Sequence, residues 1–203
     1  ALLAERFGGR VDTWATLNEP VNYLLAAYGV GQFPPGQSLY LTDFNLFTKT
    51  IRSYIDAHAA MYDAIKAHDL IDANGDGAIA EVGITLSVAE WVPARMNAPS
   101  SDPEDVAAAD HVRGVYHYLL PDSILQGRFD SQLDLELETS RPQWTGKLDW
   151  LGVQYYFRAG VTGSPALFPG LDATVCFGAF DFGACLPPED ETWHIPEMGY
   201  EFY

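Results

Sequence analysis

Three strand-like segments separated by two long helical segments restrict the fold of this chain more than any other feature. We expect strands at residues 11–18, 81–88 and 148–156, and helices at residues 44–68 and 102–120. A helix between two strands returns the chain to the starting end of the sheet, so such strands pair in parallel. The second strand segment is almost continuously apolar, as expected for a strand that is covered on both faces. The pattern therefore predicts an α/β fold with a parallel sheet.

Capping residues give the helix boundaries. Gly8 and Gly9 end a first short helix, and Asp43 is a good N-cap for the long helix that starts at residue 44. The sequence Asp102-Pro103-Glu104 suits another helix start, because proline fits the first helical position and acidic side chains favour the first turn. Residues 28–36 are rich in glycine, proline and aromatic side chains, and we expect a loop there.

Three strands are too few to close an eight-stranded (β/α) barrel. The first strand–helix turn also lacks the glycine-rich fingerprint of a nucleotide-binding sheet. The sequence contains no internal repeat and no interdomain linker. We therefore expect residues 1–203 to be a single domain, truncated at both ends, that forms part of a larger barrel.

The charge balance excludes several classes of partner. The chain has 28 acidic and 11 basic residues, a formal net charge of −17. Such a surface repels phosphate backbones and anionic lipid, so we expect no nucleic-acid binding. No run of eighteen apolar residues is present, so we expect no membrane span. The oligomeric state is not determined by these features.

Cys176 and Cys185 flank a segment rich in glycine and aromatic residues. A disulfide between them would indicate an oxidising compartment and favour a secreted protein. Two free thiols in a cytoplasmic enzyme are equally compatible with the sequence.

The segment Thr16-Leu17-Asn18-Glu19-Pro20 ends the first strand with an amide, a carboxyl group and a proline. Proline stops the ladder, so Asn18 and Glu19 are delivered to the C-terminal end of the strand. In parallel α/β folds, reacting groups lie at that end. A carboxyl group there can act as an acid or a base if its surroundings raise its pKa.

This segment resembles the acid/base motif Thr-x-Asn-Glu-Pro of the family 1 glycoside hydrolases, the β-glucosidase family. Further segments resemble that family in the same order, namely residues 7–11, 28–29, 34–36, 58–60, 82–84, 149–156 and 198–201. The resemblance implies that the chain corresponds to about strands 4 to 6 of a (β/α)8 TIM barrel, together with their helices. The barrel would not be closed within this chain.

The resemblance also implies roles for individual residues. Glu19 would be the general acid/base, and Asn18 would donate a hydrogen bond to the sugar 2-hydroxyl. Tyr156 would donate a hydrogen bond to the nucleophilic carboxylate. Gln154 stands where the family has Asn, so its longer arm would alter hydrogen bonding in the sugar pocket. Trp91, just after the second strand, is placed to stack on a sugar ring.

The family nucleophile, a Glu in a Thr-Glu-Asn-Gly motif, does not occur in these 203 residues. Retaining hydrolysis needs two carboxyl groups, so we expect this chain to carry the acid/base half of the site and to be inactive alone. The expected activity is hydrolysis of β-glucosides and short β-linked oligosaccharides, with no required cofactor. A transglycosidase and a sugar-binding pseudoenzyme remain alternatives.

Asp72, Asn74 and Asp76, followed by Gly77, resemble the first half of a calcium loop. The twelfth position should carry a bidentate Glu, but it is Gly83. A polar turn without metal explains the same residues. A structural calcium site and a calcium-dependent interaction module are therefore both open.

Overall fold

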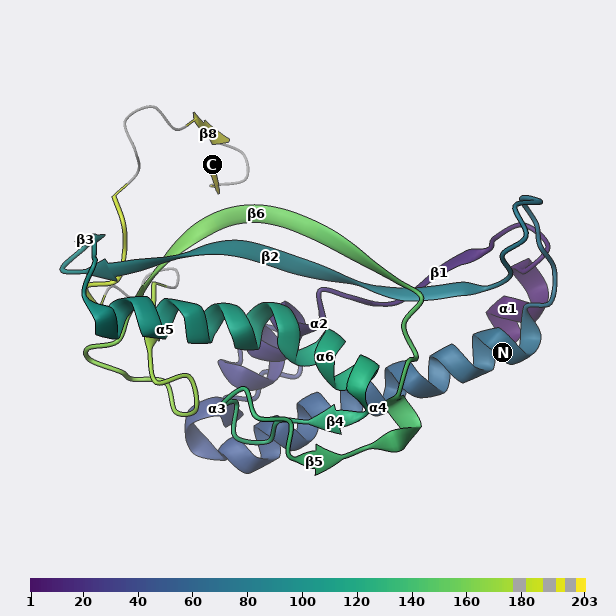
Figure 1. Cartoon of the computed structure of the whole chain (residues 1–203), viewed down its shortest axis with the longest axis horizontal. Coiled ribbons are helices and arrows are strands. Elements are labelled where there is room, and N and C mark those ends of the chain that lie inside the picture. Colours follow the sequence, from purple (N-terminus) through teal and green to yellow (C-terminus); the bar gives the residue numbers. More distant parts are fainter. Residues whose placement is uncertain (177–181, 188–192, 196–199) are drawn as a thin grey trace. The chain divides into compact units, whose positions relative to one another are not determined.

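The computed structural model describes residues 1–176, 182–187, 193–195 and 200–203 (Figure 1). The chain divides into two compact units. Unit 1 contains residues 1–86, 120–131 and 137–153, and unit 2 contains residues 87–119, 132–136 and 154–203.

The first half of the chain contains α1 (Leu2–Phe7), β1 (Thr13–Asn18), α2 (Pro20–Leu24), the π-helical η1 (Leu25–Gly29), α3 (Leu39–Thr42), α4 (Phe44–His68), β2 (Glu81–Arg95) and β3 (Ala98–Pro99). The second half contains α5 (Pro103–Arg113), the π-helical η2 (Gly114–Tyr118), α6 (Leu119–Gln126), β4 (Arg128–Phe129), β5 (Thr139–Ser140), the 3-10 helix η3 (Pro142–Trp144), β6 (Trp150–Thr162), β7 (Thr174–Val175), β8 (Trp193–Ile195) and β9 (Tyr200–Phe202).

The main sheet has the strand order β1-β2-β6-β7, with β3 added to β2. β1 and β2 are parallel, with Thr13 opposite Glu81, which confirms the predicted pairing of these strands. Among the described residues the sheet is open, as expected for part of a barrel. Two small antiparallel pairs, β4 with β5 and β8 with β9, lie apart from it in the pairing scheme.

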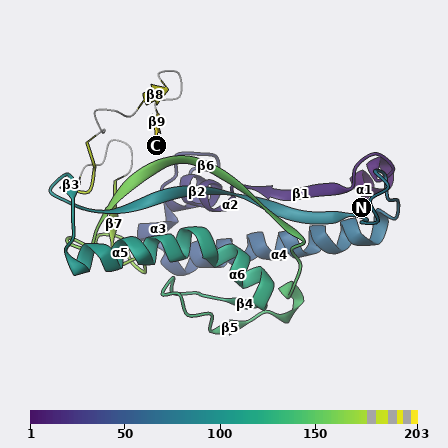
Figure 2. The same cartoon turned by 45° about the horizontal axis from the view of Figure 1, so that its top comes forward.

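The core of unit 1 forms where α4 runs beside β1 (Figure 2). The apolar side of α4 buries Phe47, Ile51 and Ile55, and the first half of β2 buries Val82 and Ile84. Burial of one such side chain contributes about 1.5–3 kcal/mol. These buried side chains of α4 and β2 therefore supply the main apolar contacts that support β1 and its C-terminal end.

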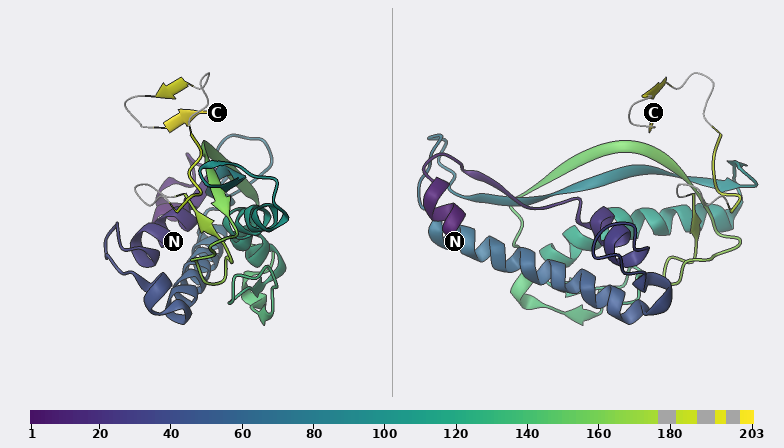
Figure 3. Two further views of the ribbon diagram at one scale, coloured as in Figure 1. Left: turned by 90° about the vertical axis from the view of Figure 1, so that its left-hand side faces the viewer. Right: turned by 180° about the vertical axis from the view of Figure 1, so that it is seen from behind.

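The start of α4 confirms a capping prediction. The backbone N–H of Leu46 donates to Asp43 Oδ1 (3.0 Å), and the helix runs from Phe44 to His68 as expected. At the other end of this helix, α1 contacts α4, so the N-terminus of the chain lies beside the end of the long helix (Figure 3).

Trp144 shows how unit 1 satisfies a buried polar atom. Its ring is fully buried and lies edge-to-face against Phe129, with centroids 6.1 Å apart. Its indole N–H donates to Asp56 Oδ1 (2.8 Å).

The second half of β2 packs against η2 in unit 2. Trp91 and Tyr116 are both buried, and their rings meet edge-to-face at 4.9 Å. The Tyr116 hydroxyl also donates to Ser87 Oγ (3.2 Å). A π-helix has about one more residue per turn than an α-helix. The side chains of η2 therefore point in other directions than they would in a continuous α-helix.

Several boundaries differ from the sequence prediction. The strand predicted at 81–88 continues to Arg95, and the one predicted at 148–156 continues to Thr162, because β3 and β7 pair with these extensions. The loop predicted at residues 28–36 begins two residues later, because Tyr28 and Gly29 belong to η1. Pro20 begins α2, because proline favours the first helical position. The helix predicted to end near residue 120 runs to Gln126.

Cys176 and Cys185 form a disulfide, the first of the two states that the sequence left open for these thiols. Of the helices in the described part of the chain, none combines the length and the apolar character that a membrane crossing requires.

Candidate active site

Asn18 and Glu19 lie where β1 ends and α2 begins. The Glu19 backbone N–H donates to the Thr85 carbonyl of β2 (2.8 Å), which fastens the turn to the neighbouring strand. The Thr85 hydroxyl donates to Asn18 Oδ1 (2.7 Å). The Asn22 side-chain amide donates to Glu19 Oε2 (3.0 Å). Neighbours within unit 1 therefore orient both polar side chains at this strand end.

Glu19 has a left-handed backbone, with φ 45° and ψ 51°. For a residue with a side chain, such a conformation costs about 1–3 kcal/mol, and it persists only where the surrounding structure enforces it. Here the strand ends at Asn18 and the next helix begins at Pro20, so Glu19 alone makes the turn. Six other described non-glycine residues also have a positive φ, so the strain marks Glu19 only together with its place at the C-terminal end of a parallel strand.

His58 anchors β1 just before this turn. Its Nε2 lies 2.6 Å from the Lys147 carbonyl oxygen, and its Nδ1 lies 2.6 Å from Thr16 Oγ1. A carbonyl oxygen only accepts, so Nε2 carries the proton and the Thr16 hydroxyl donates to Nδ1 of the neutral ring. Burial lowers the pKa of His58, although the hydrogen bond to Lys147 acts in the opposite direction. The neutral ring thus ties α4 to the strand that presents Glu19.

We expect His58 to reduce stability in mild acid. Its pKa is lowered from 6.5 in the folded chain, so the unfolded chain binds the proton more readily. The contribution of His58 is therefore complete above about pH 6.5 and is lost as the pH falls below that value. The free energy of unfolding, measured by urea denaturation from about pH 7 to pH 5, should fall less in His58→Gln than in the unchanged chain.

His68→Gln is the matched control for this measurement. His68 is partly exposed and pairs with Glu5 on the surface, so its replacement should keep the decline of the unchanged chain. Equal declines in His58→Gln and the unchanged chain would contradict the role given to His58.

Gln154 and Tyr156 form a second pair, in unit 2. They are two residues apart on β6, so their side chains lie on the same face of the strand. The Tyr156 hydroxyl donates to Gln154 Oε1 (2.9 Å). The structure therefore brings together the two β6 residues that the sequence analysis assigned to the sugar pocket.

Trp91 is not available to a ligand in this arrangement. Only 5% of it is exposed, and its ring lies against Tyr116. Arg113 donates to its carbonyl oxygen (3.0 Å), and its buried indole nitrogen has no hydrogen-bond partner among the described residues. Stacking on a sugar stays a prediction that this packing does not favour.

The sequence analysis missed an aromatic cluster beside α2. Tyr23 stacks on Tyr54 of α4 at 5.8 Å, and Tyr28 meets both rings at their edges. Burial, together with a hydrogen bond to Tyr23, raises the pKa of Tyr54 to about 12, so its hydroxyl stays protonated. The cluster supports the helix that begins at Pro20. This helix could have been predicted from Pro20 itself.

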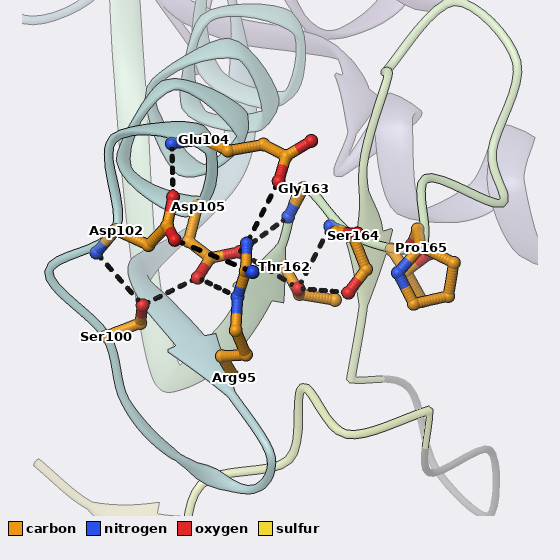
Figure 4. Close-up of polar contacts among 10 residues, drawn as sticks. Arg95, Ser100, Asp102, Glu104, Asp105, Thr162, Gly163, Ser164 and Pro165 are labelled. Carbon is orange, nitrogen blue, oxygen red and sulfur yellow. Dashed lines mark hydrogen bonds and ion pairs between the residues drawn. The ribbon is translucent and has the colours of Figure 1, made fainter.

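The sequence analysis also missed Asp105, a fully buried carboxylate in unit 2 (Figure 4). Arg95 donates to it twice, from Nε (2.8 Å) and Nη2 (3.0 Å). The Ser100 hydroxyl donates at 2.6 Å. The Thr162 hydroxyl and the Gly163 N–H each donate at 2.9 Å. Asp105 therefore joins the ends of β2 and β6 to the first turn of α5.

Burial alone would raise the pKa of Asp105. The hydrogen bonds from Arg95, Ser100, Gly163 and Thr162 outweigh burial and hold this pKa well below its usual range. The carboxylate is ionised and accepts five hydrogen bonds, so we assign it a structural role.

The three predicted calcium ligands lie in one turn of unit 1. Asp72 accepts from the N–H groups of Gly75 (2.6 Å) and Gly77 (2.9 Å). Asn74 donates to Asp76 (2.9 Å). In the part of the chain that is described, no group of three His, Cys, Asp or Glu residues could hold a metal ion. Amide groups of the turn itself therefore donate the hydrogen bonds that these side chains accept.

Comparison with known proteins agrees with this geometry. The pattern of Glycosyl hydrolase family 1 matches residues 1–167. The β-galactosidase of Pyrococcus woesei is 31% identical over 210 residues, a match that covers 100% of this chain and 39% of that protein. The chain thus spans about two fifths of this relative's length. The resemblance at residues 198–201 falls partly outside the described residues.

Solved structures show the same fold. The β-glycosidase of Pyrococcus horikoshii matches with a TM-score of 0.69 at 21% identity, covering 100% of this chain and 39% of that one. A Thermotoga maritima β-glucosidase in complex with glucoimidazole matches with a TM-score of 0.66 at 21% identity, covering 92% and 40%. The open sheet therefore corresponds to part of the (β/α)8 barrel that these proteins have.

The strained carboxyl group after β1, the paired residues on β6 and the match over residues 1–167 lead to one conclusion. This chain belongs to glycosyl hydrolase family 1.

Proposed function

We propose that this chain is the acid/base segment of a retaining β-glycosidase, with Glu19 as the general acid/base. The observation that carries the proposal is the position of Glu19, held in a strained backbone at the C-terminal end of a barrel strand. The nucleophilic carboxylate and the remaining strands would come from outside these 203 residues.

In the first step, Glu19 protonates the glycosidic oxygen while the nucleophile forms a bond to the anomeric carbon. In the second step, Glu19 removes a proton from water, which then displaces the nucleophile. Asn18 contributes a donor for the sugar 2-hydroxyl, because the Thr85 hydroxyl bonds to its carbonyl oxygen and an amide NH₂ group can only donate. Tyr156 and Gln154 of unit 2 supply a hydroxyl and an amide for sugar hydroxyl groups.

The substrates we propose are β-glucosides and short β-linked oligosaccharides. Relatives carry the names β-glucosidase and β-galactosidase. In β-glucosides and β-galactosides alike, the β-linked leaving group is equatorial. The reaction needs no metal or organic cofactor, because two carboxyl groups and water provide all the proton transfers. The disulfide supports a secreted enzyme, because such bonds persist in oxidising compartments.

The test compares two polypeptides on an aryl β-glucoside. A polypeptide that contains this segment together with a complete barrel should release the phenol, and proton NMR should show the β-anomer of the sugar as first product. The 203-residue chain alone should give no turnover, because it supplies one carboxyl group of the required pair. Turnover by the short chain would refute the division of the site. Sugar binding without turnover by the complete barrel would instead indicate a pseudoenzyme.

Whether Asp72, Asn74 and Asp76 bind calcium is tested separately, and we expect a metal-free turn. Because amide groups already bond to these side chains, we expect the turn to keep its fold and the chain its Tm in EDTA. Isothermal titration with Ca²⁺ checks this. A saturable heat of binding that disappears in Asp72→Ala would establish a calcium site and contradict the metal-free turn.

A further inference from the structure

Asn22 lies in the first turn of α2, three residues after Glu19. An N-cap residue and the third residue of its helix are neighbours, so the side chain of Asn22 can reach back to the carboxyl group. Its Nδ2 lies 3.0 Å from Glu19 Oε2, and both side chains are half-buried in unit 1. The Asn22 amide is therefore a direct neighbour of the carboxyl group to which we assign the acid/base role.

The helix that carries Asn22 is held firmly in place. Pro20 and Leu24 on either side of it are buried. The backbone N–H of Tyr23 donates to the carbonyl oxygen of Glu19 (3.1 Å), and the Tyr23 ring stacks on Tyr54 of α4 at 5.8 Å. A side chain on such a support keeps a constant position relative to the group that it contacts. The Asn22 amide can therefore act as a fixed donor for Glu19.

The amide of Asn22 can donate to Glu19 in both protonation states of the carboxyl group. A side-chain NH₂ group only donates. An ionised carboxyl group accepts on both oxygens, whereas a protonated one accepts on one oxygen and carries the proton on the other. The contact of Nδ2 with Oε2 therefore persists after protonation if the proton is on Oε1. The contact selects the oxygen on which the proton resides.

We propose that Asn22 is a positioning residue for the general acid, which makes Oε1 the oxygen of Glu19 that gives and takes the proton. This inference rests on the proposed function. In the first step the Oε1–H bond breaks, the proton bonds to the departing glycosidic oxygen, and the electron pair stays on Oε1. In the second step Oε1 takes a proton from water, whose oxygen bonds to the anomeric carbon as the nucleophilic carboxylate departs. Asn22 keeps its own protons throughout.

The test uses the polypeptide with the complete barrel and two aryl β-glucosides. Without the Asn22 amide, the carboxyl group can turn about its last bond and direct the proton away from the glycosidic oxygen. We expect Asn22→Leu to lower kcat/KM about 10- to 100-fold on phenyl β-glucoside, because misplacing a catalytic group by about 1 Å costs that much. On 2,4-dinitrophenyl β-glucoside the change should be less than about threefold, because this leaving group departs without protonation.

The comparison of substrates separates positioning from folding, because a damaged fold lowers kcat/KM for both glucosides alike. Asn22→Ala removes the same donor, and alanine suits a helix, so it tests the contact if Asn22→Leu does not fold. Asn45→Ala is the matched control. Asn45 is also an asparagine in the first turn of a helix of unit 1, but its side chain is exposed, so kcat/KM should not change.

A double-mutant cycle tests whether Asn22 acts through Glu19. In Glu19→Gln there is no acidic proton to place, so adding Asn22→Leu should lower kcat/KM on phenyl β-glucoside no further. A further loss as large as that caused by Asn22→Leu alone would show that Asn22 acts independently of Glu19, and would overturn the positioning role.

The results distinguish this inference from the proposed function. If Glu19→Gln loses activity on phenyl β-glucoside and Asn22→Leu and Asn22→Ala do not, the role of Asn22 is overturned and the proposed function stands. Equal losses on both glucosides in the Asn22 variants would also overturn the positioning role, because they indicate support of the fold alone. A complete barrel without hydrolase activity would overturn both proposals.

Discussion

Glu19→Gln should lower kcat of the complete enzyme about 10²- to 10⁴-fold on substrates with a poor leaving group, the range for loss of a general acid. Gln keeps the size of the side chain and its contact with Asn22, but it cannot protonate the glycosidic oxygen. An activated leaving group such as 2,4-dinitrophenolate departs without protonation. For such substrates, formation of the glycosyl-enzyme should be much less affected.

Added azide gives a second measurement. A small anion can attack the glycosyl-enzyme without general-base help, so azide should restore turnover of the activated substrate in Glu19→Gln and yield the β-glycosyl azide. The exposed Glu5 provides a control, and Glu5→Gln should keep full activity. Equal losses for good and poor leaving groups, without rescue by azide, would remove Glu19 from the acid/base role.

Asp105→Asn should destabilise the chain by about 1.5–3 kcal/mol, the range for a lost hydrogen bond between charged groups. The amide cannot accept all five hydrogen bonds, and Arg95 loses its buried counter-charge. The free energy of unfolding in urea, followed by tryptophan fluorescence, measures the loss. In a chain with the usual stability of about 5–15 kcal/mol, the change would remove a large part of the lower value.

Glu104→Gln is the matched control, because Glu104 is an exposed partner of the same arginine. Its replacement should cost less than about 1 kcal/mol. The pKa of Asp105 is depressed in the folded chain, so its contribution is present above the ordinary value of 3.8 and is lost as the pH falls below it. Similar losses for Asp105→Asn and Glu104→Gln would contradict the central position given to Asp105.

Local signals predicted the parts of the fold that depend on neighbouring residues. Asp43 caps α4 as its side chain and position indicated, and the apolar run after Glu81 became a buried strand. The end of β1 was predicted to deliver Asn18 and Glu19, and the structure places them there. Caps, apolar periodicity and a strand-ending proline act over a few residues, so sequence alone contains them.

The network of Asp105 could not be predicted in the same way. Its donors lie up to 58 positions away along the chain, and an acidic residue in a first helical turn is ordinary in any soluble protein. The packing of residues 182–187 on β6 depends on the contact of Gly160 with Ala184, 24 positions further on. Such contacts follow from the paths of β2 and β6 and leave no local pattern. Helix α2 was predictable from Pro20, but the glycine- and aromatic-rich stretch that follows obscured it.

The terminal position of β1 in the strand order has a consequence for handling the chain. Among the described residues β1 pairs only with β2, so its outer side offers peptide groups that another molecule can join. The charge of −17 keeps copies apart at low ionic strength, whereas 1 M salt shortens the screening length to about 3 Å and removes this protection. Solutions of the 203-residue chain should therefore stay clear in dilute buffer and become turbid as salt is added. A polypeptide in which the rest of the barrel covers that edge should stay clear in both.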